Sequence, residues 1–396
     1  MNTPVLVINA GSSSLKYQLL DADSGETQAS GIIERIGESD SYAAHSGPNG
    51  KHRRDVDCPN HHAAFLLLSG SFEEFGPSLD EIDLVAVGHR VVHGGDRFSA
   101  PVLIDDEVES TIESLIPLAP LHNPGNLEGI RRARERFPDV PQVAVFDTAF
   151  HQTLPPHAYT YAVPSTWRTD YGVRRYGFHG TSHAYVSRRA AELIHHPIDD
   201  ANVIVLHLGN GASATAVQGG RSIDTSMGLS PLEGLVMGTR AGDLDPSLPG
   251  HLGRMGISVE DYDRALNKES GLKGLTGSND FRELEERMEA GDSDAQLAFD
   301  VVVHRLRKYI GAYAAVLGRL DAVAFTAGVG EHSPILRAAT LEGLGLLGIE
   351  LDAAANAAAG SGEHVISTPD SPVTVLVIPT AEELEIAQQA AALVHR

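Results

Sequence analysis

Two stretches of the chain share a pattern in which a short apolar run meets a turn of small polar residues and a second run follows. The first stretch has an apolar run at residues 5–8, the turn NAGSSS at 9–14 and a returning run at 15–20. The second has an apolar run at residues 203–208, the turn GNGAS and a run at 214–217. Each pattern predicts a strand, a tight loop and a returning strand. One supersecondary unit is therefore used twice, roughly half a chain apart.

Apolar residues that recur every three or four positions predict a long helix over residues 294–320, which we expect to pack on a sheet. The recurring positions are Val302, Leu306, Ile310, Tyr313, Leu317 and Leu320. A third apolar run, residues 321–327, is expected to enter a glycine loop at 328–330 before a helical segment. Residues 381–395 are helix-like and are expected to pack back on the first half of the chain, whereas residues 37–62 are polar and carry no motif.

A chain of 396 residues exceeds the size that one hydrophobic core usually serves, so the length predicts about two domains. The pair Pro155-Pro156 is a plausible boundary. A single cysteine, Cys58, excludes an internal disulfide framework and fits a reducing cytoplasm. The N-terminus has no signal-peptide pattern and no long apolar stretch predicts a membrane span, so we expect a soluble, cytoplasmic protein.

Acidic residues outnumber basic residues by 53 to 30, and the net charge of −23 disfavours nucleic acid or an anionic membrane as a partner. An anionic ligand must therefore be met by cations gathered locally. Arginines and histidines do gather among glycines in HRVVHGG, at residues 89–95, and in RYGFHGTSH, at 175–183. A third stretch, residues 224–246, combines glycines and aspartates with Arg240, and such a planar cation suits an anion. The alternative for this stretch is an ordinary solvated loop.

Small residues in the two turns let backbone N–H groups approach phosphate oxygens, although tight hairpins use the same residues for their geometry. The chain has no GxxxxGK[ST], HExxH or paired CxxC motif. Metal binding by the histidine-rich stretches lacks ligand spacing, and a lone histidine is more often structural. Two acids follow apolar runs, Asp147 and Glu382, and they are either magnesium ligands or acids at a helix N-terminus.

Taken together, a dozen motifs in register resemble the acetate kinase family over residues 5–390. The strings that carry the resemblance are INAGSSSLKY, HRVVHGG, LHNP, FDTAFH, RYGFHGTSH, LGNGAS, DTSMGLSPLEGLVMGTRAGDLDP, FTAGVGEHSP and IPTAEEL. The resemblance implies an α/β protein with two ribonuclease-H-like (actin-like ATPase) domains, a duplicated core and an active-site cleft between them. The expected domains are residues 1–150, with a C-terminal helix at 383–396 packing back on them, and residues 151–382, which bind the nucleotide.

The resemblance also implies a reaction, which is the reversible transfer of the γ-phosphoryl group of ATP to acetate, with acetyl phosphate and ADP as products. Mg²⁺ or Mn²⁺ is the expected cofactor, and the expected assembly is a homodimer. Direct in-line transfer is expected, since acetate is already ionised at pH 7 and needs no general base.

Site roles follow from the resemblance motif by motif. Residues with catalytic roles are Arg90, His122, Asp147, His179 and Arg240. The acid is expected to bind to Arg90, and its methyl group is expected to occupy a small apolar pocket formed by Val92, Leu121, Phe178 and Pro231. Contacts to the nucleotide come from Asn9, Ser12, Ser14, Lys16, His207, Gly209, Asn210, Gly211, Asp280, Phe281, Arg282, Gly328, Gly330 and Glu331. The metal ligands are Asn9 and Glu382.

Two positions depart from the family pattern. Thr380-Ala381 precedes the glutamates where the family usually has an asparagine, so either Glu382 or Glu383 is the metal-associated acid. His332 stands where asparagine is usual, next to the adenosine segment.

Three alternatives stay open beside acetate phosphorylation. A propionate or butyrate kinase would share the same motifs, because one methylene in an apolar pocket discriminates by only about 1 to 3 kcal/mol. An ATP-switched protein of the chaperone or actin type would share the phosphate loops, but it would not need Arg90, His179 and Arg240 together. A histidine metalloenzyme is disfavoured by the missing ligand spacing.

Overall fold

The computed structural model describes residues 3–395, and the chain divides into two compact units. Unit 1 comprises Met1–Phe150 and Ala381–Arg396, and unit 2 comprises His151–Thr380. The ends of the first predicted domain and of the C-terminal helix, residues 1–2 and 396, lie outside the described residues. Residues 381 and 382 go with unit 1, two residues before the expected start of the returning helix. None of the helices within residues 3–395 combines the length and the apolar character that crossing a membrane requires.

Unit 1 is built on an eight-stranded sheet with the strand order β5-β4-β3-β2-β1-β6-β8-β7. Strands β1 to β5 pair antiparallel in sequence, β1, β6 and β8 run parallel, and β7 pairs antiparallel with β8. The strands are β1 Pro4–Ala10, β2 Ser14–Asp21, β3 Thr27–Glu34, β4 Tyr42–Gly47, β5 Gly50–Asp55, β6 Ala86–Val91, β7 Val102–Leu103 and β8 Gln142–Phe146. The register Ile8↔Tyr17 confirms the first predicted strand-loop-strand pair.

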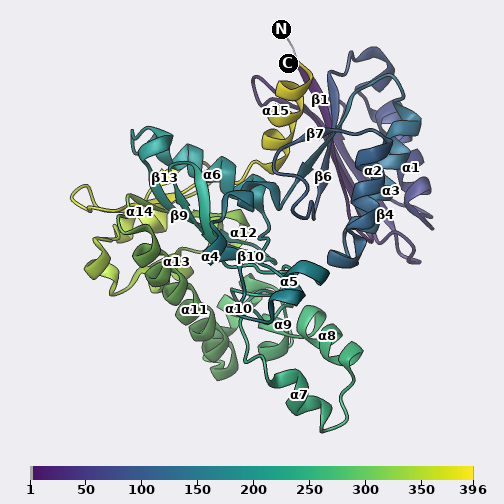
Figure 1. Ribbon diagram of the computed structural model, residues 1–396. Helices are drawn as coiled ribbons and strands as arrows, with labels where there is room; N and C mark the ends of the chain where they lie inside the picture. The colour runs from purple at the N-terminus through teal and green to yellow at the C-terminus, as the bar shows by residue number, and fades with distance from the viewer. Residues whose placement is uncertain (1–2, 396) are drawn as a thin grey trace. The chain divides into compact units, whose positions relative to one another are not determined.

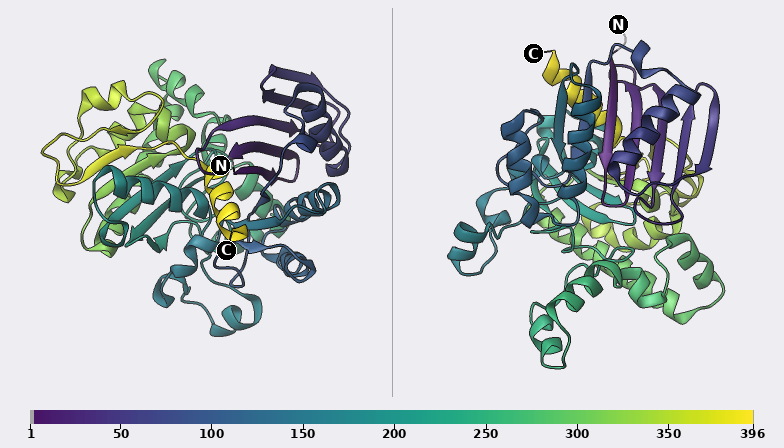
Figure 2. Two further views of the ribbon diagram at one scale, coloured as in Figure 1. Left: turned by 90° about the horizontal axis from the view of Figure 1, so that it is seen from above. Right: turned by 90° about the vertical axis from the view of Figure 1, so that its right-hand side faces the viewer.

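Helices cover both faces of this sheet, as Figure 2 shows. One core lies under α1 (His61–Phe75) and contains Leu6, Ile8, Leu68 and Phe72. The other joins Val5 and Val7 to α15 (Glu382–Val394), which lies beside β1 (Figure 1). The alternation along β1 sends even-numbered side chains to one core and odd-numbered ones to the other. The remaining helical segments of unit 1 are α2 Asp106–Ser114, α3 Asn123–Arg136, η1 Leu79–Glu81 and η2 Ile116–Leu118.

Unit 2 repeats the arrangement on a six-stranded sheet with the order β11-β10-β9-β12-β14-β13. Its first three strands pair antiparallel, whereas β9, β12 and β14 run parallel, as β1, β6 and β8 do in unit 1. The strands are β9 Asn202–Leu208, β10 Ala212–Gln218, β11 Arg221–Thr225, β12 Ala322–Thr326, β13 His364–Val365 and β14 Thr374–Val377. The shared strand order confirms the predicted α/β fold with a duplicated core.

The helices of unit 2 include two that pack on its central strands. Helix α6 (Gly180–Leu193) contacts β9 and β12, and α11 (Ser293–Leu317) contacts β9 and β10. The other helices are α4 Pro156–Tyr159, α5 Ser165–Tyr171, α7 Leu248–Gly253, α8 Val259–Lys268, α9 Gly271–Thr276, α10 Phe281–Glu289, α12 Ala327–His332, α13 Pro334–Leu341 and α14 Ala353–Ala358. Shorter turns are η3 Ala149–Thr153, η4 Ile198–Asp200 and η5 Leu344–Leu347.

Two expectations about local structure were wrong. The long helix ends at Leu317, because Gly318 adopts φ +72°, and Leu320 therefore lies beyond it. The glycines at 328–330 form no loop, since β12 runs directly into α12 through Ala327 at φ +63°. Residues 37–62, for which no structure was predicted, contain the hairpin β4–β5 at the edge of the sheet, where a polar sequence is common.

Candidate active site

In unit 1, the first turn of α3 holds two loop ends in place. The amide nitrogen of Asn126 donates to the carbonyl of Ala10 at 2.6 Å, and its oxygen accepts the backbone N–H of Val92 at 3.0 Å. Gly125 allows this approach, because a Cβ there would stand 2.7 Å from the carbonyl oxygen of Gly11. The predicted phosphate loop after β1 and the residue after β6 are thereby fixed relative to each other. Asn126 was missed in the sequence, although it lies just beyond the LHNP string.

Arg90 and Asp147 come from neighbouring parallel strands, at the end of β6 and directly after β8. The guanidinium donates through Nε and Nη2 to the two carboxylate oxygens at 2.9 and 2.8 Å. Glu382, the first residue of α15, places Oε2 3.8 Å from Nη1 of Arg90. Burial acts to lower the pKa of Arg90, but the two carboxylates outweigh burial and raise that pKa above its ordinary value. The fold thus gathers three predicted site residues from distant segments.

The two candidate metal-associated acids have different surroundings. The side chain of Glu382 is 15% exposed, and burial raises the pKa of its carboxyl group, although Arg90 opposes the rise. Glu383 instead lines a cavity of about 530 Å³ together with Asn9 and Lys16. Among residues 3–395 no three His, Cys, Asp or Glu side chains gather into a preformed metal site. A single glutamate, Glu382 or Glu383, fits Mg²⁺ that is brought in by a nucleotide, because Mg²⁺ is usually bound through one or two carboxylates plus substrate phosphates.

In unit 2, the loop between β9 and β10 is the second predicted phosphate loop. The N–H of Gly209 donates to the carbonyl of Gly211 at 3.0 Å, and the carbonyl of Asn210 accepts the N–H of Gly238 at 2.9 Å. A Cβ on Gly211 would stand 2.7 Å from Nη2 of Arg240 and 3.6 Å from Nε2 of His179. Only glycine at this position lets the loop backbone come so close to both side chains. The loop, the arginine and the histidine therefore form one cluster.

Arg240 differs from Arg90 and Arg175 in its partners, since each of those two is paired with a carboxylate. Its Nη1 donates to the carbonyl of Pro231 at 2.5 Å, and within residues 3–395 no carboxylate lies within ion-pairing distance of its guanidinium. Burial lowers the pKa of Arg240, because the charged form loses hydration that no anion of the protein replaces. A half-buried guanidinium without a counter-ion, set beside a glycine loop, is complementary to an anionic ligand.

His179 is held in an unusual backbone conformation, with φ +56°, at the N-cap of α6. Its ring stacks on His207 with the ring centroids 4.2 Å apart, and its Nδ1 hydrogen-bonds to the hydroxyl of Ser213 at 2.9 Å. A backbone conformation of this kind in a non-glycine residue is strained and is often found at functional sites. Ser213 was not predicted, and the LGNGAS string marked only its place after the loop.

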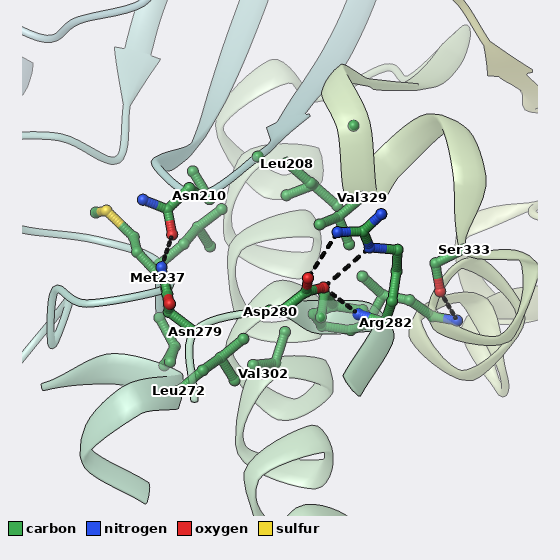
Figure 3. A pocket seen from close by; sticks show the side chains of 18 of the residues that line it. Leu208, Asn210, Met237, Leu272, Asn279, Asp280, Arg282, Val302, Val329 and Ser333 are labelled. Carbon is green, nitrogen blue, oxygen red and sulfur yellow. Dashed lines mark hydrogen bonds and ion pairs between the residues drawn. The ribbon is translucent and has the colours of Figure 1, made fainter. Parts of the chain in front are cut away.

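A cavity of about 660 Å³ opens beside the phosphate loop of unit 2 (Figure 3). Its polar side carries Asn279, whose amide donates to Asn210 at 3.1 Å, and Asp280, which is ion-paired with Arg282 at 2.6 Å. The hydrogen bonds from Arg282 lower the pKa of Asp280 to about 2 and keep it ionised. The apolar side is formed by Leu208, Ala212, Leu235, Val236, Met237, Leu272, Phe281, Val302, Leu306, Val329 and Leu336. An apolar slot next to a phosphate loop suits a purine ring.

Eight of the predicted nucleotide contacts belong to the segments around this cavity. Those that line the cavity are Gly209, Asn210, Asp280, Phe281, Arg282 and Gly328. Gly330 and Glu331 do not line it, because their carbonyls accept Nη1 of the buried Arg337 and the carboxylate of Glu331 accepts the N–H of Thr380. The lining residues Asn279, Glu285 and Gly238 were missed.

The remaining predicted residues are divided between the units. His122 is the N-cap residue of α3, and Ser12 and Ser14 lie in and after the first loop of unit 1. Of the four residues assigned to a methyl pocket, Val92 and Leu121 belong to unit 1, and Leu121 is 47% exposed. Phe178 and Pro231 belong to unit 2, where the Phe178 side chain is only 1% exposed.

Comparison with known proteins decides the family. Residues 4–388, nearly the whole chain, match the family model described as "Acetokinase family". The chain belongs to the acetokinase family. Members of this family with similar sequences include "Acetate kinase" of Leifsonia xyli subsp. xyli, 59% identical over 98% of each chain. Another is "Acetate kinase" of Streptomyces coelicolor, 56% identical over 99% of this chain and 97% of the other.

Solved structures of the acetokinase type agree with the fold. A crystal structure of Porphyromonas gingivalis acetate kinase has a TM-score of 0.94 and 43% identity, and covers 100% of both chains. A propionate kinase from Francisella tularensis is similar to nearly the same degree, with a TM-score of 0.92 and 42% identity over 98% of each chain. An acetate kinase and a propionate kinase are thus similar to this chain to nearly the same degree. The choice of acid has to be tested directly.

Proposed function

We propose that this protein is an acetate kinase that transfers the γ-phosphoryl group of ATP reversibly to acetate, giving acetyl phosphate and ADP. The observation that carries the proposal is the cluster around Gly211, in which Arg240 lies beside a predicted phosphate loop and has no carboxylate partner among residues 3–395. A switch ATPase of the chaperone or actin type needs the loop but not a guanidinium held ready for a further anion. Membership of the acetokinase family, with curated relatives named acetate kinase, supports the same conclusion.

The nucleotide is proposed to bind to unit 2. Its base would occupy the apolar side of the 660 Å³ cavity, and its phosphates would approach the backbone N–H groups of the loop at 209–211. Asn210 stands where cavity and loop meet, and its side chain is held by Asn279 at 3.1 Å.

Arg240 and His179 are proposed to stabilise the transferring phosphoryl group, since its equatorial oxygens bear the charge in the transition state. Arg90 is proposed to bind the carboxylate of acetate, with Asp147 holding its guanidinium in a fixed plane. The carboxylate attacks the γ-phosphorus as the bond to the ADP oxygen breaks, so no group on the protein carries the phosphoryl group. Acetate is ionised at pH 7, and no side chain has to remove a proton.

Glu382 and the amide of Asn9 are proposed to hold a magnesium ion that accompanies ATP. When bound, Mg²⁺ neutralises charge on the β- and γ-phosphates. Glu382 is preferred to Glu383, because its Oε2 lies 3.8 Å from Nη1 of Arg90. Mg²⁺ or Mn²⁺ as the cofactor, a homodimer and a cytoplasmic location remain predictions. Equilibrium ultracentrifugation of the purified chain tests the dimer, and a single species of monomer mass would contradict it.

The choice of acid is tested by a coupled assay of acyl phosphate formation with acetate, propionate, butyrate and no acid. Acetate is expected to give the highest kcat/KM, and propionate is expected to react more slowly, since a methylene costs about 1 to 3 kcal/mol in a small apolar pocket. A higher kcat/KM for propionate would make the protein a propionate kinase. ATP turnover that is indifferent to any acid would favour the switch-ATPase alternative.

A further inference from the structure

His183, Ser213 and His179 are joined by hydrogen bonds, and His179 lies next to the loop at 209–211. Nδ1 of His179 and Nε2 of His183 both hydrogen-bond to the hydroxyl oxygen of Ser213, at 2.9 and 2.7 Å. Ser213 and His183 are 0% exposed. Within residues 3–395 the Ser213 hydroxyl has these two partners and no third. Because one hydroxyl proton lies between two ring nitrogens, the proton positions on the three side chains depend on one another.

Nδ1 of His183 determines which group donates in each of these hydrogen bonds. This nitrogen is buried and has no hydrogen-bond partner within the described part of the chain. A buried N–H without an acceptor is rarer than a buried lone pair without a donor, because the lost hydration of the N–H is not replaced. Burial, and then the nearby His151 and His207, lower the pKa of His183 well below its ordinary value, so its ring is neutral. Its single proton therefore lies on Nε2 and is donated to Ser213.

Ser213 must then donate its own proton to Nδ1 of His179. If His179 donated to Ser213 instead, the hydroxyl proton would have no acceptor. In neutral His179 the ring proton consequently lies on Nε2, the nitrogen on the side of Gly211 and Arg240, 3.6 Å from the position of a Cβ on Gly211. An N–H at this place can donate to a phosphoryl oxygen, whereas a bare lone pair would repel it.

We infer that Ser213 and His183 are positioning residues that hold His179 in the tautomer with its proton on Nε2. The consequence for catalysis rests on the proposed function, since it assumes that a phosphoryl group passes beside Gly211. The tautomer itself does not depend on that assumption. It follows from the hydrogen bonds of the three side chains, from the burial of Ser213 and His183 and from the neutral ring of His183.

The direct test is ¹⁵N NMR of the full-length protein labelled at histidine, with the His179 signals assigned by their loss in His179→Gln. We expect Nε2 of His179 to show the shift of a protonated ring nitrogen and Nδ1 that of an unprotonated one, without any substrate. In Ser213→Ala and in His183→Leu the two nitrogens should move towards a mixed pattern. Protonation on Nδ1 in the wild type, or a pattern unchanged in both variants, would overturn the inference whether or not the protein phosphorylates acetate.

Kinetics separate positioning from a merely structural role. Ser213→Ala is expected to lower kcat about 10- to 100-fold, as loss of an orienting partner commonly does, with KM for ATP and acetate nearly unchanged. His183→Gln keeps a hydrogen-bonding group near Ser213 and should recover part of the kcat lost in His183→Leu. The matched control is Ser187→Ala on the same helix, where a buried serine only donates to the carbonyl of Ala184 at 3.0 Å. Equal kcat in the Ser213 and Ser187 variants would contradict the inference, and Ser213→Ala alone decides it if His183→Leu does not fold.

Discussion

Both carboxylate oxygens of Asp147 are occupied by Nε and Nη2 of Arg90, at 2.9 and 2.8 Å, so the two side chains lie in one plane. Asp147 is 1% exposed and directly follows β8, the strand next to that of Arg90. This geometry makes Asp147 the partner that fixes the direction of Arg90. It leaves Nη1, the nitrogen near Glu382, as the edge of the guanidinium that an acid would meet.

Asp147→Asn should therefore weaken binding of acetate more than binding of ATP. The amide keeps the size of the carboxylate but presents an NH₂ group to the guanidinium, and a hydrogen bond to a charged group contributes about 1.5 to 3 kcal/mol. We expect KM for acetate to rise about 10- to 100-fold and KM for ATP to change little. Asp139→Asn, at an exposed position of the same unit, is the control. An unchanged KM for acetate would show that Arg90 does not need this partner.

Gly211→Ala and Gly360→Ala form a matched pair in unit 2. A methyl group on Gly211 would stand 2.7 Å from Nη2 of Arg240 and displace it, whereas one on the exposed Gly360 meets no atom within 4 Å. Losing one preorganised donor commonly costs about 100-fold or more in kcat, so we expect a fall of that order in Gly211→Ala only. Steady-state assays of both variants give the comparison. An equal kcat in the two variants would contradict the assigned role of Arg240.

Magnesium dependence should change with pH through Glu382. Burial raises the pKa of its carboxyl group, so the acid keeps its proton at a pH where an exposed glutamate has lost it. Below that raised pKa the neutral acid is a poor ligand, and above it the carboxylate binds Mg²⁺ well. The Mg²⁺ concentration that gives half-maximal activity should therefore fall as the pH rises through the raised pKa.

The glutamate responsible is identified by repeating this titration with two variants. Glu382→Gln should raise the Mg²⁺ requirement and remove its pH dependence, whereas Glu383→Gln should keep the wild-type profile. The opposite result would make Glu383 the metal-associated acid. Two unchanged profiles would place the metal ligands elsewhere.

Arg337 should stabilise unit 2 through the end of α12. Its side chain is 0% exposed and donates to the carbonyls of Gly330 and Glu331 and to Asn356 at 2.8 to 3.0 Å. Replacement by leucine leaves these buried acceptors unsatisfied, at about 1 to 3 kcal/mol each. We expect Arg337→Leu to lower the free energy of unfolding by about 4 kcal/mol in denaturant titrations, because four acceptors lose their donor. Arg254→Leu, at an exposed position, should change it by less than about 0.5 kcal/mol, and equal effects would contradict this account.

Local patterns predicted the parts of the fold that depend on short-range order. Both strand-loop-strand pairs, the strand before Ala327 and most of the long helix follow from periodicity, because buried faces repeat every two or 3.6 residues. The hairpin β4–β5 was missed because it lies at the edge of the sheet and needs few apolar residues. The entry from β12 into α12 was mistaken for a loop because of the two glycines at 328 and 330. The local sequence does not show that Arg337 stabilises this helix by donating to the carbonyl of Gly330.

The candidate site shows a similar division. Arg90, His179 and Arg240 were found because they lie in glycine-rich strings, and Asp147 was found because it follows an apolar run. Asn126, Ser213, His183 and Asn279 were missed, since each acts by a hydrogen bond to a residue between 30 and 116 positions away in the chain. Such contacts arise only when strands and helices are placed side by side, and no spacing along the chain reports them.

The central claim is tested most directly by measuring acyl phosphate formed from ATP, Mg²⁺ and acetate by the wild type, by Arg240→Ala and by the exposed-site control Arg254→Ala. The account predicts acetate-dependent product from the wild type and the control, and a loss of about 100-fold or more in Arg240→Ala. Full activity in Arg240→Ala, or no acyl phosphate from the wild type while ATP is still hydrolysed, would contradict it.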